Sequence, residues 1–133
     1  MTLRQNLYVN EGETWSFVYT HLDNSGNAVD LTGYTSAMSI RREYGGSLMA
    51  YLTTGADADG GTITLGGATG IITISMTATE TGSFISGIDI DSLISGENVA
   101  NVEPYIFDLE IVDGETVTRV LQGAFLIRRG VTQ

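Results

Sequence analysis

The sequence predicts an all-β fold, and three observations lead to that prediction. Glycine provides 17 of the 133 residues, about 13% against a usual ~7%, so turns are frequent. Short segments alternate apolar and polar residues, and turn residues separate them at the spacing of a β-sandwich. The alternation of strands with long helices that is typical of α/β folds is missing. We therefore expect one domain over residues 1–133, an antiparallel, immunoglobulin-like β-sandwich of about eight short strands with one short helical turn.

The clearest strand signal is a hairpin near the end of the chain. Over residues 105–111 apolar side chains alternate with acidic ones, the pattern of a strand with one buried face. Asp113-Gly114 then supplies turn residues, and a second strand runs over residues 116–121. Gly123 predicts a bulge or bend, after which the apolar strand continues to residue 127.

The register of this hairpin depends on the length of its turn. A two-residue turn places Asp108 opposite Arg119, whereas a four-residue loop places Glu110 opposite Arg119. In both cases Arg119 meets a carboxylate, and such an exposed cross-strand pair contributes ~0.2–1 kcal/mol. We expect the pair to fix register more than stability.

Further strands are expected before that hairpin. Trp15, Phe17 and Tyr19 alternate with polar or small residues, and we predict that this aromatic stripe, Trp15 included, packs in the core. The same residues could instead form a carbohydrate-binding platform, in which case the rings would face solvent. The expected strands cover residues 3–9, 15–20, 34–42, 48–53, 62–65 and 71–76.

Polar clusters between these strands predict turns and one short helix. The cluster Asp23–Asn27 suggests a calcium loop, but a twelve-residue loop with a terminal Glu does not follow, so we predict a turn. Asp57 and Asp59 lie in a glycine-rich loop, and two carboxylates without further ligands bind a cation weakly. Thr77 and Glu80 have the spacing of a capping box, which predicts about one helical turn.

The stretch from Gly82 to Glu103 is apolar without a regular period. It is too apolar for a solvated linker and too irregular for a strand, so it either folds over an open end of the core or forms a contact surface. The sequence leaves these two interpretations equal. We name the stretch as the candidate partner-contact segment, with the chain ends at residues 1–5 and 130–133 added to it. Its large apolar side chains are Phe84, Ile88, Ile90, Leu93 and Ile94.

Charge and cysteine content exclude several classes of partner. The net charge is −10, with sixteen acidic residues against six basic ones, all arginine. A field of that sign repels phosphate backbones and anionic lipids, so we expect no nucleic-acid or membrane partner. Without cysteine there is no disulfide, thiolate nucleophile or cysteine-ligated metal. The start of the chain has no apolar signal segment, and no apolar run approaches the ~20 residues of a spanning helix, so we expect a soluble protein made in a cytosol.

Few side chains in the sequence suit catalysis. His21, the only histidine, lies where a strand runs into a turn, which favours a surface or strand-end role. Asp89 and Asp91 alternate with apolar residues as a glycosidase pair would, but adjacent acids in an irregular segment are more often only solvated. We predict that the protein is not an enzyme and uses no cofactor, metal or small-molecule ligand.

A series of turn and strand motifs resembles those of a known family. The motifs are Asp30-Leu31-Thr32-Gly33, Ile40-Arg41-Arg42, Gly70-Ile71-Ile72-Thr73-Ile74, Thr77-Ala78-Thr79-Glu80-Thr81, Tyr105-Ile106-Phe107-Asp108-Leu109-Glu110, Asp113-Gly114 and Gly123. Over roughly residues 10–128 they resemble the small immunoglobulin-like domains of tailed-bacteriophage virion proteins, such as the N-terminal domain of baseplate upper proteins.

The resemblance implies a structural role without catalysis. The expected function is an assembly or adaptor module of the tail, baseplate or fibre attachment, made in the bacterial host cytoplasm and present in the virion. Its expected partners are other virion proteins, with homo-oligomeric or multi-copy assembly. A capsid cement or decoration protein is one alternative. A free carbohydrate- or ligand-binding module that uses Trp15, Tyr19 or the Asp57–Asp59 loop is another.

Overall fold

The computed structural model describes residues 3–54, 60–83 and 102–128. Within these ranges no helix has the length and apolar character needed to cross a membrane. Four strands have the predicted bounds: β3, β5, β6 and β7. The elements in chain order are β1 (Leu3–Arg4), β2 (Leu7–Asn10), β3 (Trp15–Thr20), β4 (Thr35–Arg41), β5 (Leu48–Thr53), β6 (Thr62–Leu65), the 3-10 turn η1 (Gly67–Thr69), β7 (Ile71–Met76), α1 (Ala78–Thr81), β8 (Val102–Asp113) and β9 (Thr116–Arg128).

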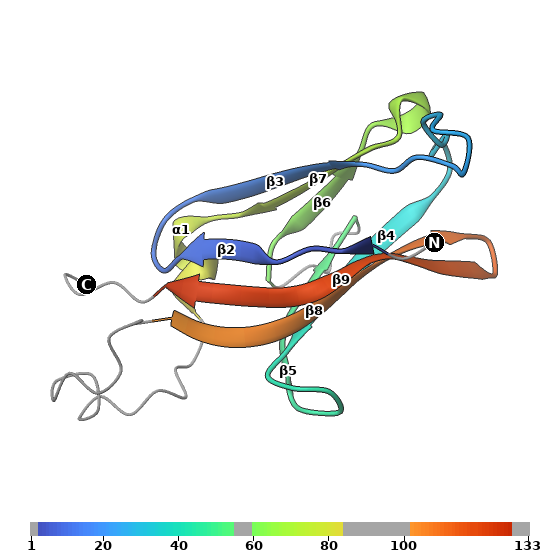
Figure 1. Ribbon diagram of the computed structural model, residues 1–133. Coiled ribbons are helices and arrows are strands. Elements are labelled where there is room, and N and C mark those ends of the chain that lie inside the picture. The colour runs from blue at the N-terminus through green and yellow to red at the C-terminus, as the bar shows by residue number, and fades with distance from the viewer. Residues whose placement is uncertain (1–2, 55–59, 84–101, 129–133) are drawn as a thin grey trace, which may run out of the picture.

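The strands form two packed layers (Figure 1). The small layer contains β6, β7 and β3, and the large layer contains β2, β9, β8, β4 and β5, with β1 preceding β2 along β9. The two layers are joined through β5 and β6 by the single residue pair Thr53 and Thr62. This arrangement confirms the predicted all-β, immunoglobulin-like sandwich with one short helix.

The strands pair antiparallel except between β5 and β6 and where β1 and β2 pair with β9. The strand expected over residues 3–9 is two strands, β1 and β2, and both run parallel to β9. Between them the backbone N–H of Gln5 donates to the carbonyl of Gln122 at 2.9 Å. The side-chain oxygen of Asn6 accepts from the backbone N–H of Ala124 at 3.3 Å. A Cβ atom at Gly123 would collide with the Gln5 carbonyl, so glycine permits this close approach.

Substituting Gly123 by alanine should destabilise the protein, because the added methyl group must push the β1–β2 segment away from β9. We expect the free energy of unfolding to fall by about 1–3 kcal/mol, the usual cost of overpacking. Urea unfolding followed by tryptophan fluorescence measures the change. The control is Gly26→Asn, since a Cβ at Gly26 meets open space and asparagine tolerates its left-handed backbone (φ 85°). Equal losses in the two variants would contradict this account.

The β8–β9 hairpin has the register in which Glu110 lies opposite Arg119. Asp113 pairs with Thr116, so the two loop residues are Gly114-Glu115, one position later than the expected Asp113-Gly114 turn. Gly114 has a φ of 62°, the left-handed conformation for which glycine is favoured. The register therefore matches the second of the two sequence alternatives, although the loop itself has two residues.

The register of β9 against β8 shifts at Val120. This is three residues before Gly123, where the sequence predicted a bulge or bend. Val120 and Leu121 are both buried, which interrupts the alternation of β9, and Leu121 pairs with Leu109. Arg119 also forms the predicted cross-strand ion pair, with its Nε 3.5 Å from Oδ2 of Asp108. Because both side chains are partly exposed, this pair contributes ~0–1 kcal/mol at most.

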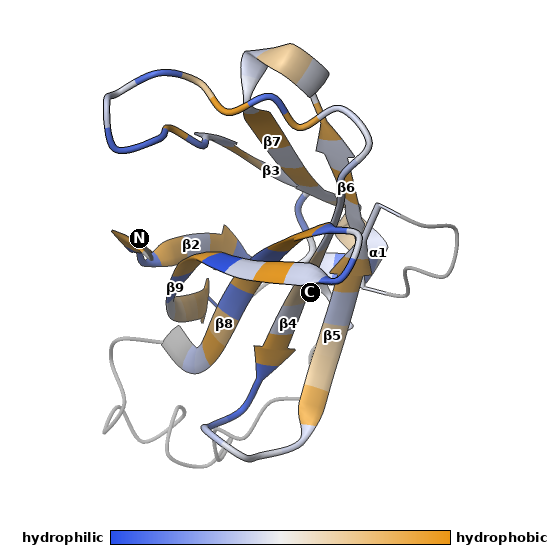
Figure 2. Cartoon of the chain, turned by 90° about the vertical axis from the view of Figure 1, so that its right-hand side faces the viewer, coloured by the Kyte–Doolittle hydropathy of each residue, from blue (hydrophilic) through white to orange (hydrophobic). Residues whose placement is uncertain are grey.

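The core lies between the two layers, and hydrophobic and hydrophilic segments alternate along the strands that enclose it (Figure 2). Trp15, Phe17 and Tyr19 of β3 pack against this core but remain half-buried. The prediction that Trp15 packs in the core therefore holds only in part, because β3 is the outer strand of its layer. The largest fully buried side chains are Tyr105, Phe125, Leu31, Met38, Ile40, Leu52, Ile72, Ile74, Met76, Leu109, Leu121 and Ile127.

The predicted capping box starts α1. The hydroxyl oxygen of Thr77 accepts from the backbone N–H of Glu80 at 3.1 Å, and the Glu80 carboxylate accepts from the backbone N–H of Thr77 at 2.7 Å. The hydroxyl of Thr81, at the end of this helix, is buried and donates to the backbone carbonyl of Glu13 at 2.8 Å. This bond ties α1 to the segment that enters β3.

Replacing Thr81 by valine should destabilise the fold at nearly constant volume. The methyl group removes the hydrogen bond to the Glu13 carbonyl, and the loss of one hydrogen bond costs about 0.5–1.5 kcal/mol. Thermal unfolding by circular dichroism measures the loss. Thr79→Val is the matched control, because Thr79 lies exposed on the same helix. Similar melting temperatures for the two variants would remove the structural role assigned to the Thr81 hydroxyl.

Candidate functional site

Several residues singled out from the sequence lie outside the described ranges. They are the predicted contact residues Phe84, Ile88, Ile90, Leu93 and Ile94, together with Asp57, Asp59, Asp89 and Asp91. Within the described part of the chain, no cluster of three or more histidine, aspartate or glutamate side chains is arranged to hold a metal ion. The candidate site is therefore built from residues of the strands and turns.

The Asp23–Asn27 cluster forms a turn, as predicted. Oδ1 of Asp23 accepts from the backbone N–H groups of Ser25 at 2.9 Å and Asn27 at 3.0 Å. Oδ1 of Asp30 likewise accepts from the hydroxyl and the backbone N–H of Thr32, and these bonds hold the pKa of Asp30 below its usual value. Oδ1 of Asp23, one of the oxygens that suggested a calcium loop, thus orders the backbone of the turn.

The outer face of the large layer carries a groove around Tyr44. Two shallow depressions, of about 250 and 420 Å³, share Tyr44 and Ile106. Tyr44 belongs to the turn between β4 and β5, and 77% of it is exposed. We call this surface the Tyr44 groove. Its main polar side chains are Arg4, Ser39, Arg41, Asp108, Arg119 and Gln122.

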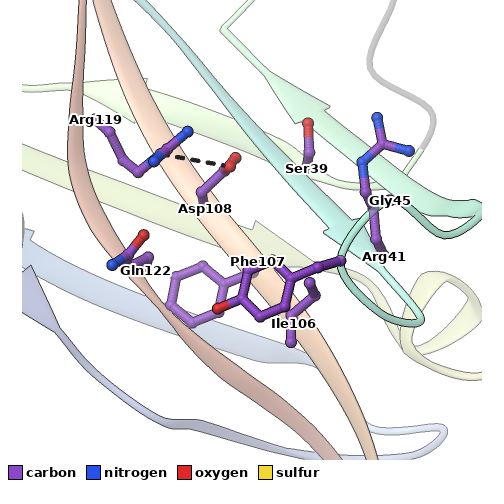
Figure 3. Close-up of a pocket in the computed structure, with 9 residues that line it drawn as sticks. Ser39, Arg41, Gly45, Ile106, Phe107, Asp108, Arg119 and Gln122 are labelled. Atoms are coloured by element: carbon purple, nitrogen blue, oxygen red, sulfur yellow. Dashed lines mark ion pairs between the residues drawn. The ribbon is translucent and has the colours of Figure 1, made fainter.

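Strand register brings these side chains together. Ser39 of β4 lies opposite Asp108 of β8, which lies opposite Gln122 of β9. In the next outward row, Arg41 of β4 lies opposite Ile106 of β8. Figure 3 shows Ser39 and Arg41 on one side of Asp108 and Ile106, with Gln122 on the other. The inward positions of the same strands fill the core, so their outward positions are left to form this surface.

The groove gathers positive charge on an acidic protein. Three of the six basic residues, Arg4, Arg41 and Arg119, line it, although the net charge is −10. Nη1 of Arg41 donates to the carbonyl of Gly46 at 3.0 Å, which fixes the arginine beside the β4–β5 turn. Guanidinium groups and an exposed phenol favour binding to carboxylates and planar groups. No histidine lies among the residues lining the two depressions.

The only histidine lies at a separate hollow at the end of β3. This hollow, about 440 Å³, is lined by Leu3, Tyr19, His21, Leu22 and Asp23, among others. Nδ1 of His21 is buried and has no hydrogen-bond partner among the described residues. Burial lowers the pKa of His21 and raises the pKa of Tyr19. In the described part of the chain, Oδ1 of Asp23 accepts from its own turn and Nδ1 of His21 has no carboxylate partner.

The partly buried histidine makes stability depend on pH. The unfolded chain binds a proton at His21 near its ordinary pKa of 6.5, whereas the folded protein resists protonation. The stabilisation from keeping His21 neutral is therefore complete above pH ~6.5 and is lost as the pH falls below that value. Urea unfolding at pH 7.5 and pH 5.5 should show a larger loss for the wild type than for His21→Gln. Parallel losses in both proteins would contradict the assignment.

Tyr44 was not among the residues predicted from the sequence to form a site. A local signal was present, because Tyr44 stands between three charged residues, Arg41-Arg42-Glu43, and the pair Gly45-Gly46, where a turn leaves a large ring in solvent. The remaining groove residues come from strands that are distant in the sequence. Their assembly follows from pairing, which a local pattern does not specify.

Comparison with known proteins finds similar solved structures but no match by sequence. No family model matches the chain, and no curated protein matches it by sequence. Similar solved structures include the extracellular domain of the voltage-gated sodium channel beta4 subunit, described as parallel homodimers with a role in cell-cell adhesion. It is 11% identical with a TM-score of 0.43, over 96% of this chain and 93% of that chain. Tim-1 is 10% identical with a TM-score of 0.37, over 100% of this chain and 97% of that chain.

Proposed function

We propose that the protein is a non-catalytic structural module of a bacteriophage virion. It acts as an adaptor of the tail, baseplate or fibre attachment and docks on neighbouring virion subunits in several copies. The motif resemblance to virion immunoglobulin-like domains supports the virion setting. The Tyr44 groove supports docking on a protein surface.

The composition of the Tyr44 groove is the observation that carries this proposal. Tyrosine and arginine are enriched at protein interfaces and at their energetic hot spots. The groove combines the exposed ring of Tyr44 with Arg41 and Arg119, and Tyr8 and Tyr51 occupy exposed outward positions of the same layer. Its local positive charge suits a partner surface that carries carboxylates.

The groove favours protein docking over a glycan platform on β3. Such a platform needs rings that face solvent, whereas Trp15 stacks on Phe17 at 6.4 Å and meets the edge of Phe125 at 5.6 Å. Tyr19 also packs against the core. The rings of this aromatic stripe are therefore engaged with each other and with the core, although they remain half-buried.

Incorporation into particles tests the proposal. Mass spectrometry of purified particles should detect the protein at a fixed copy number. Tyr44→Ser should keep the melting temperature of the wild type but bind its virion partner about 30-fold more weakly, since removing a hot-spot tyrosine costs about 2 kcal/mol. Its copy number in particles should fall accordingly.

The control is Val117→Ser, which changes a residue that is 57% exposed and does not line the Tyr44 groove. This variant should enter particles as the wild type does. Particles that lack the wild-type protein would contradict the virion role. Normal incorporation of Tyr44→Ser would contradict docking through the groove, and oligosaccharide binding that is lost in Tyr44→Ser would favour the ligand-binding module.

A further inference from the structure

Strand β3 is an open edge of the small layer. It pairs with β7 over all six of its residues and has no strand on its other side among the described residues. Natural edge strands usually carry charges, proline or a bulge that prevent pairing with another chain. The β3 sequence Trp15-Ser16-Phe17-Val18-Tyr19-Thr20 carries none of these, and its register with β7 is unbroken.

Hydrogen-bond direction identifies the free backbone groups of this edge. The backbone N–H of His21 donates to the carbonyl of Gly70, so residue 21 points its backbone groups toward the β7 side. These groups alternate in direction along an antiparallel strand. Ser16, Val18 and Thr20 therefore direct their N–H and C=O groups away from β7, into solvent.

Among the described residues of the small layer, the surface beside this edge carries no charged side chain. On the outer face of the small layer, the outward side chains belong to serine, threonine, valine and isoleucine. Val18 is 58% exposed at the centre of the edge. Two copies can therefore meet here without placing charged side chains against each other along the strand, although each has a net charge of −10. The outward residues are Ser16, Val18, Thr20, Thr62, Thr64, Ile71, Thr73 and Ser75.

We propose that β3 is a homodimerisation edge, and that β3 of a second copy pairs with it antiparallel about a twofold axis through Val18. In this register Val18 faces Val18 of the second copy, and Ser16 faces Thr20 of the second copy. All three residues with free backbone groups then find partners in both copies, because the arrangement is self-complementary. The inference is independent of the proposed virion role.

Twofold pairing closes the assembly at two copies. Both β3 edges are used, and the two small layers become one continuous sheet of six strands. The interface is small, so we expect a weak dimer with a dissociation constant of about 10 µM to 1 mM. Glu13 and Asp23 lie just beyond opposite ends of β3, so added salt should tighten the dimer by screening acids of the two copies.

Single-cysteine cross-linking tests the register, because the natural chain has no cysteine. Hydrogen-bonded antiparallel partners have Cα atoms about 5.5 Å apart, within the usual disulfide range of about 4.4–6.8 Å. Val18→Cys should form a disulfide-linked dimer on mild oxidation. Val117→Cys is the matched control, since Val117 is equally exposed (57%) on the other layer. Equal cross-linking of the two variants would overturn the proposal.

Charge substitution at the same position tests the association itself by sedimentation. Val18→Lys and Val18→Glu should each weaken self-association by about a hundredfold, because each places like charges on the axis. Mixing the two variants should restore a heterodimer, and Val117→Lys should dimerise as the wild type does. A wild type that stays monomeric at about 1 mM, or a Val18→Lys variant that still dimerises, would overturn the proposal.

Amide exchange provides a readout for each residue. On dimerisation the backbone N–H groups of Ser16, Val18 and Thr20 should gain protection. Those of Phe17 and Tyr19 should change little, because they already point toward β7. Uniform protection along β3, or protection confined to the Tyr44 groove, would assign the dimer to another surface. The Tyr44→Ser variant leaves β3 intact and should dimerise as the wild type does. Its dimerisation therefore tests the β3 edge separately from docking through the Tyr44 groove.

Discussion

The ring of Phe125 connects the two layers, and the rest of the sandwich is arranged around it. Phe125 extends inward from β9 and meets Trp15 of the opposite layer edge to face, with ring centroids 5.6 Å apart. It also meets Phe107 of the neighbouring strand at 6.5 Å. In immunoglobulin domains with a disulfide, a covalent bond crosses between the sheets. This chain has no cysteine, so apolar burial and ring contacts hold the layers together.

The need to bring Phe125 into the core accounts for the position of β9 between an antiparallel neighbour, β8, and the parallel neighbours β1 and β2. Its inward residues must reach the core, while one edge pairs with β8 and the other accepts β1 and β2 in parallel. The shift at Val120 places two successive side chains inward, and Gly123 then lets the chain start approach closely. The outward positions of the same strand contribute Arg119 and Gln122 to the Tyr44 groove. The register of β9 thus determines both which of its side chains enter the core and which line the Tyr44 groove.

The sequence predicts the parts of this fold that depend on local pattern. Regular alternation between turn residues placed β3 and β7 correctly, and the Thr77 and Glu80 pair predicted α1 through the hydrogen bonds it can form. The break between β1 and β2 could not be predicted, because it depends on Gly123, more than a hundred residues away. The half-burial of Trp15 follows from β3 lying at an edge, and strand order is a property of the whole chain. The Tyr44 groove was not predicted for the same reason, because its residues come together only through the order of the strands.

The two proposed contacts use different layers and different chemistry, so one does not block the other. The Tyr44 groove lies on the outer face of the large layer and relies on an aromatic ring and guanidinium groups, whose attraction to an acidic partner weakens with salt. The β3 edge belongs to the small layer and relies on backbone hydrogen bonds between uncharged residues, and salt strengthens it by screening the net charge of each copy. A dimer joined at β3 would hold two grooves at a fixed separation. Two weak contacts in one rigid unit bind a repetitive surface far more tightly than either alone, because the second contact forms at high effective concentration. A weak dimer contact at β3 is therefore sufficient for tight binding when the partner surface itself repeats.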